Sequence, residues 1–119
     1  MNTRQLAFAS LIACAALIMP RVALAHAHLL SSTPAANATV HGPDVAIDLR
    51  FNSRVETKGS TVTLVLPGGQ TQRLAIDSHS SDVNLDAHAH LKPGAYTLRW
   101  QALSTDGHIT RGEFPFTVR

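Results

Sequence analysis

Beyond residue 44, apolar and polar residues alternate in a series of short runs, and this period of two restricts the fold more than any other feature. Val45, Ile47, Leu49 and Phe51 form the clearest run. Such alternation is typical of strands with one buried face, whereas an amphipathic helix would space its apolar residues by three and four. No segment after Ala25 keeps the helical spacing over three turns. The sequence therefore predicts an essentially all-β domain.

Turn signals separate this run from several others. Pro67-Gly68-Gly69 and Lys92-Pro93-Gly94 are the strongest of these signals. The remaining predicted strands cover residues 62–66, 74–76, 83–85, 96–100 and 114–118. Short strands at this spacing favour a two-sheet sandwich or a Greek-key barrel. Because Pro115 cannot donate a ladder hydrogen bond, we expect the last strand to lie at a sheet edge or to contain a bulge.

The first 25 residues have the three-part pattern of a secretory signal peptide. Arg4 lies in a short polar start, an apolar run extends from Leu6 to Met19, and Ala23-Leu24-Ala25 provides an A-x-A cleavage site. The apolar run is shorter than the ~20 residues that a membrane-spanning helix needs. We therefore expect a helical signal peptide over residues 1–25, cleaved after Ala25, followed by one domain over residues 26–119.

A second processing route stays open. Leu11-Ile12-Ala13-Cys14 resembles a bacterial lipobox, in which cleavage precedes a lipidated cysteine. Lipoproteins usually become polar after that cysteine, whereas apolar residues here continue to Met19. We favour cleavage after Ala25 and keep lipidation of Cys14 as the alternative.

The charge of the chain depends on this processing. The two signal arginines, Arg4 and Arg21, account for the excess of ten Lys and Arg over eight Asp and Glu. The domain after Ala25 therefore has no formal net charge and no basic excess that would favour nucleic acid. Cys14 and both methionines also precede the domain, which leaves it without a sulfur ligand or a disulfide.

All seven histidines follow Ala25, and some of them have the spacing of metal ligands. Cleavage would give His26 a free α-amine beside its imidazole, and these two nitrogens could chelate one ion. Asp106 and His108 lie two positions apart, so on an extended segment their side chains point the same way. Nitrogen donors in tetragonal geometry favour Cu(II). We interpret His41 and His79 as ordinary surface residues.

Several motifs occur together in this domain, and they resemble those of the CopC family of periplasmic copper-resistance proteins. They are His26-Ala27-His28-Leu29, Pro93-Gly94-Ala95-Tyr96, Ser104-Thr105-Asp106-Gly107-His108 and Gly112-Glu113-Phe114. The resemblance implies an immunoglobulin-like sandwich or Greek-key β-barrel in the periplasm. It also implies that one Cu(II) ion is bound by His26, Asp106 and His108, and that the protein could deliver copper to a CopD-like inner-membrane importer.

The chain departs from the family pattern in one informative respect. Some members carry a methionine-rich loop that binds Cu(I), but no methionine follows Met19 here. We therefore expect no methionine-type Cu(I) site.

Other histidines offer alternatives to this ligand set. His28 would be the third residue of the processed chain, and such a terminus can bind Cu(II) through its own amine, amides and imidazole. That mode excludes Asp106 and His108, and we favour the folded site. His88 and His90 form a second H-x-H motif. We expect them to be surface residues or a weaker secondary site.

An N-terminal histidine that holds copper is also the signature of copper oxygenases, which makes a copper-dependent oxidase or oxygenase the alternative function. Those enzymes usually have a larger domain and a broad aromatic binding face. The aromatic residues after Ala25 all occupy apolar positions of predicted strands: Phe51, Tyr96, Trp100, Phe114 and Phe116. The sequence therefore favours a copper-binding protein for resistance or homeostasis rather than an enzyme.

Overall fold

The computed structural model describes residues 26–78 and 80–119, so the expected signal helix over residues 1–25 lies outside the described part. Every regular element in the described part is a strand, which confirms the all-β prediction. None of the described residues forms a helix able to cross a membrane. The strands are β1 (Leu29–Thr33), β2 (Thr39–Val40), β3 (Asp44–Phe51), β4 (Val55–Val65), β5 (Thr71–Leu74), β6 (Asn84–His90), β7 (Gly94–Ser104) and β8 (Ile109–Val118).

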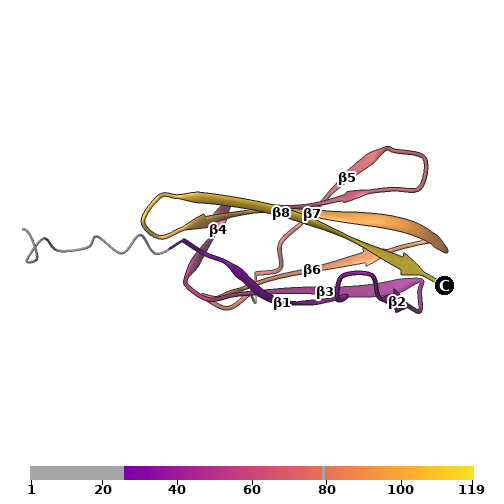
Figure 1. The fold of residues 1–119 in the computed structure, drawn as a ribbon, viewed down its shortest axis with the longest axis horizontal. Coiled ribbons are helices and arrows are strands. Elements are labelled where there is room, and N and C mark those ends of the chain that lie inside the picture. The colour runs from indigo at the N-terminus through magenta and orange to yellow at the C-terminus, as the bar shows by residue number, and fades with distance from the viewer. Residues whose placement is uncertain (1–25, 79) are drawn as a thin grey trace, which may run out of the picture.

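The strands form two sheets that face each other in a sandwich (Figure 1). One sheet has the order β1-β3-β6, and the other has the order β2-β8-β7-β4-β5. The chain crosses from the first sheet into β2 of the second and returns at β3. It crosses again between β3 and β4, returns between β5 and β6, and crosses a last time into β7. All pairings are antiparallel except the short one between β2 and β8. Of the two predicted architectures, the fold is the immunoglobulin-like sandwich, since the sheets remain open.

The predicted alternation decides which side chains fill the space between the sheets. Val45, Ile47, Leu49 and Phe51 of β3 are all buried, while their neighbours along the strand are exposed or half-buried. Phe51 meets Trp100 of β7 edge to face, with ring centroids 5.2 Å apart, a favourable aromatic geometry. The five aromatic residues assigned to the core are each no more than 9% exposed: Phe51, Tyr96, Trp100, Phe114 and Phe116. These rings are therefore used in packing the core.

β8 is the second strand of its sheet, with the two-residue β2 outside it, so the edge position expected from Pro115 holds for only part of β8. β2 borders β8 only at Thr117 and Val118, so most of the outer side of β8 has no neighbouring strand. The carbonyl oxygen of Pro115 accepts a hydrogen bond from the amide of Asn37 over 2.7 Å on that outer side. The register between β7 and β8 has no bulge. The missing N–H of Pro115 therefore costs no pairing with β7.

Four segments differ from the sequence prediction. β1 and β2 were not predicted, because neither contains clear alternation. β4 begins at Val55 rather than near residue 62, and its register with β7 shifts between Glu56 and Thr61. Ile76 lies beyond the end of β5, although it still packs against the core. Tertiary packing rather than local pattern determines these elements.

Candidate metal centre

The hairpin between β7 and β8 places Asp106 and His108 at one end of the sandwich. Gly107 lies between them with φ of 90°, a conformation that favours glycine because it carries no Cβ. The amide of Ser104 donates to the carbonyl oxygen of His108 over 2.8 Å, and the amide of Gly107 donates to that of Ser104 over 3.0 Å. These bonds close a tight turn from which both candidate ligands project.

The Asp106 carboxylate is held by this same turn. Its Oδ1 contacts the hydroxyl of Ser104 and accepts from the amide of His108 over 3.2 Å. These two hydrogen bonds, that of Ser104 first, lower the pKa of Asp106 to about 2, so the group is an anion at neutral pH. Its Oδ2 lies 3.2 Å from Nδ1 of His108. Because Oδ1 is bound within the turn, Oδ2 is the oxygen available to a metal ion.

Residues 26–28 are fixed against this hairpin by backbone hydrogen bonds. The carbonyl oxygen of Ala27 accepts from the hydroxyl of Thr110 on β8 over 2.8 Å, and the side chain of Ala27 is fully buried. The amide of His28 donates to Oδ1 of Asn52 over 2.7 Å, and its carbonyl oxygen accepts from the amide of Asn52 over 3.0 Å. The start of the described chain is therefore held between β8 and the loop after β3.

This arrangement brings two of the predicted ligands into contact. The imidazole rings of His26 and His108 meet edge to face with centroids 5.0 Å apart. The ring of His28 lies farther from His26, with centroids 6.4 Å apart, and His28 is exposed. Residues that are 82 positions apart in the sequence thus share one small surface.

His26 has a feature that fits a metal ligand. Its Nδ1 atom is buried and has no hydrogen-bond partner among residues 26–78 and 80–119. A buried polar atom without a partner is unusual in proteins and costs free energy. A metal ion bound at this nitrogen would remove that cost, and the nearby donors are an imidazole and a carboxylate, which suit a borderline divalent cation.

The donor atoms do not yet surround one point. Within residues 26–78 and 80–119, no group of three or more His, Cys, Asp or Glu side chains is arranged to hold a metal ion. Nδ1 of His108 and Oδ2 of Asp106 face each other over 3.2 Å, so these two atoms contact one another rather than a shared ion. In the full chain the backbone nitrogen of His26 is also a peptide nitrogen, which is a poor donor.

The remaining histidines lie elsewhere. His88 and His90 occupy the exposed face of β6, and His41 is exposed between β2 and β3. His79 lies outside the described residues.

The sequence did not identify Thr110 and Asn52 as residues that support the candidate site. Their contribution consists of pairing with backbone atoms of residues 27 and 28, and a sequence carries no signal for such pairing.

Comparisons with known proteins cover the whole sandwich. The CopC domain family matches residues 29–119. Protein YobA of Escherichia coli K12 is 37% identical over 122 residues, which cover 99% of this chain and 98% of YobA. The crystal structure of CopC from Methylosinus trichosporium OB3b matches 78% of this chain and 93% of that protein, with 27% identity and a TM-score of 0.71. PcoC, a methionine-rich copper resistance protein from Escherichia coli, matches 80% of this chain and all of PcoC, with 27% identity and a TM-score of 0.66.

Proposed function

Because this chain belongs to the CopC family, we propose that it is a periplasmic copper(II)-binding protein that carries or buffers one Cu(II) ion for copper resistance and homeostasis. The observation that carries this proposal is the contact between His26 and His108, with the Nδ1 atom of His26 buried and without a partner in the described part of the chain. Copper resistance is what PcoC is named for, and the shared fold supports extending it to this chain.

In the proposed site, cleavage after Ala25 completes the ligand set. His26 then offers its new amine and its Nδ1 atom, which together close a chelate ring. His108 supplies a second imidazole, and Asp106 supplies the Oδ2 oxygen that its turn leaves available. Three nitrogens and one oxygen are a donor set that suits tetragonal Cu(II).

The oxidation state follows from the donor atoms. Cu(I) prefers thiolate and thioether ligands. The chain has no cysteine or methionine after Met19. We therefore assign Cu(II), with nitrogen and oxygen donors, as the cargo of the site.

Delivery to a CopD-like importer in the inner membrane is the step that we propose for the bound ion. The side chains of Asp106 and His108 remain 36% and 45% exposed, so a partner could reach the ion without unfolding of the domain. An oxidase or oxygenase would need a substrate face, and no observation favours one, because the aromatic residues described above serve the core.

The test is a Cu(II) titration of the chain that begins at His26, followed by electron paramagnetic resonance. We expect one tightly bound ion with a tetragonal, nitrogen-dominated signal. His108→Ala and Asp106→Ala should weaken binding at least tenfold, whereas His28→Ala should not. If instead only His28→Ala weakens binding, the ion is held by the chain terminus alone and the folded site is wrong.

A further inference from the structure

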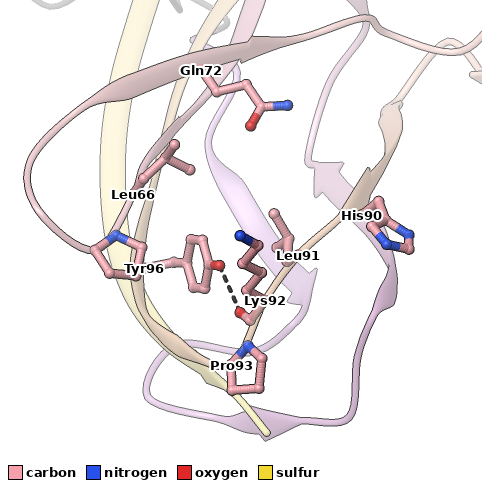
Figure 2. A pocket seen from close by; sticks show the side chains of 8 residues that line it. Leu66, Gln72, His90, Leu91, Lys92, Pro93 and Tyr96 are labelled. Carbon is pink, nitrogen blue, oxygen red and sulfur yellow. Dashed lines mark hydrogen bonds between the residues drawn. The ribbon is translucent and has the colours of Figure 1, made fainter.

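Two histidines outside this site lie side by side on the outer face of the three-stranded sheet. His88 and His90 are two residues apart on β6, so both side chains point to the same face, while Ala87, Ala89 and Leu91 point into the core. Figure 2 shows His90 and Leu91 on opposite sides of the chain. The two imidazoles are about three-quarters exposed, at 73% and 76%. Their Cα atoms are about 6.6 Å apart on an extended strand.

Each imidazole is oriented by its own carboxylate. Nδ1 of His88 lies 2.8 Å from Oδ2 of Asp77, which follows β5. Nδ1 of His90 lies 3.1 Å from Oδ1 of Asp44, at the start of β3. Histidines that ligate metals are commonly held in this way, with one ring nitrogen bonded to a carboxylate and the other facing the ion. The Nε2 atoms of both rings are thereby left as donors.

The surface between the two rings is hollow. The cross-strand neighbour of His88 on β3 is Ala46, whose side chain is a single methyl group, and the neighbour of His90 is Asp44. One surface pocket is lined by all four of these residues. The pocket therefore leaves room for an ion beside the two imidazoles.

We propose that His88 and His90 hold a second Cu(II) ion through their Nε2 atoms, with water in the remaining coordination positions. Two protein donors are enough for such a site, which is consistent with the lack of any group of three or more metal-binding side chains in the described residues. Copper(II) heads the affinity order of first-row divalent ions for imidazole nitrogen, so it is the metal that this pair takes before zinc or nickel. With fewer ligands, this site is weaker than the first and fills after it.

The two sites are far apart. Asp44 begins β3 beside His90, whereas Phe51 ends β3 next to Asn52, which pairs with His28 near the first site. The seven steps between Asp44 and Phe51 span about 23 Å. The ions therefore bind independently, and each can be removed without the other.

A titration of the chain that begins at His26 tests this second site, because that chain contains all eight strands. Calorimetry with Cu(II) should give a tight equivalent followed by a weaker one. His88→Ala and His90→Ala should each remove the weaker equivalent and keep the tight one. His41→Ala replaces another exposed histidine and should keep both. Circular dichroism verifies that each variant is folded.

A second variant examines the role of the carboxylates. Asp77→Asn should weaken the second equivalent by about 10- to 100-fold, because His88 loses the group that orients its ring. One equivalent in the unmodified chain, or a second that survives in the His88→Ala/His90→Ala double variant, would overturn the proposal. His108→Ala should remove only the tight equivalent, so failure of the first site is distinguishable from failure of the second.

Discussion

The hydroxyl of Thr110 donates a hydrogen bond to the carbonyl oxygen of Ala27 over 2.8 Å and so joins β8 to the segment that carries His26. Thr110 follows His108 by two residues. The start of β8 therefore lies beside the candidate ligand His108 and also carries the hydroxyl group that holds the segment of His26. Because this bond limits where His26 can move, we expect the copper affinity of the proposed site to depend on it.

Replacing Thr110 therefore gives a first prediction. Thr110→Val keeps the shape of the side chain but removes the donor, leaving the Ala27 carbonyl without this partner. We expect Cu(II) affinity to fall by about tenfold, or about 1.4 kcal/mol, as His26 becomes less well placed. Competition titration measures the loss, and Thr105→Val, at an exposed position of the same hairpin, serves as the control. Equal affinities in the two variants would show that the bond does not position His26.

The free amine of His26 gives a second prediction. A chain extended by one residue, so that it begins at Ala25, converts this amine into a peptide nitrogen. Cu(II) binding should weaken at least tenfold, about 1.4 kcal/mol, with the β fold unchanged by circular dichroism. If the extended chain binds copper as tightly as the chain beginning at His26, the amine is not a ligand.

Redox preference gives a third prediction. With imidazole, amine and carboxylate donors only, the proposed site should bind Cu(I) far more weakly than Cu(II). Competition with a Cu(I) chelator measures this difference, and PcoC, described as methionine-rich, is a suitable comparison protein. Comparably tight binding of both oxidation states would contradict the assignment of the cargo as Cu(II).

A fourth prediction concerns pH and a pair of carboxyl groups, Asp48 and Asp86, on the three-stranded sheet. Asp86 lies directly opposite Asp48 on β3, and hydrogen bonding to Asp48, burial and charge repulsion raise the pKa of Asp86 from 3.8 to about 6. Between pH 4 and 6 the folded state thus holds a proton that the unfolded state has released, so stability falls as pH rises through this range.

Asp86→Asn removes this charge and keeps a donor toward Asp48. The metal-free variant should be more stable than the parent at pH 7.5, by up to about 1 kcal/mol because solvent screens partly exposed charges, and the difference should vanish near pH 4. Urea unfolding at both pH values measures it. Asp82→Asn changes an exposed carboxylate and should have little effect at either pH. A stabilisation that is equal at both pH values would mean that the shared proton is not its cause.

A fifth prediction concerns Gly112, which lies opposite Trp100 in the register of β7 and β8. A Cβ atom at this position would lie 2.5 Å from Cζ2 of the indole ring. Gly112→Ala should therefore displace Trp100 from its contact with Phe51 and destabilise the fold by about 1–3 kcal/mol. Urea unfolding followed by tryptophan fluorescence measures the change, and Glu113→Ala, at an exposed neighbour, should cost less than about 1 kcal/mol. No change in Gly112→Ala would mean that the ring can shift freely.

The strands that could be predicted from the sequence are those in which buried and exposed residues alternate. Two strands could be predicted because every second residue enters the core: those over Val45 to Phe51 and Tyr96 to Trp100. β1 has no such pattern, since Leu30 is 62% exposed and the strand is defined by its pairing with β3. Long-range pairing of this kind leaves no local trace in the sequence.

The same distinction applies to the candidate site. Asp106 and His108 are visible in the sequence as a spaced pair, and His26 is visible through its place after a cleavage signal. Their proximity depends on the fold, which brings residue 26 beside residue 108. The contact between Oδ2 of Asp106 and Nδ1 of His108 could not be deduced from spacing.

The complete burial of Ala27 means that the proposed site would depend on cleavage of the leader at one exact position. Because Ala27 is enclosed in the core, a chain cut one position early or late cannot shift along the fold to place another residue where His26 lies. In the proposed function, the accuracy of the protease that removes the leader would then set the fraction of molecules able to take up copper. Whether a given molecule can bind copper would thus be decided when the peptide bond between Ala25 and His26 is cut.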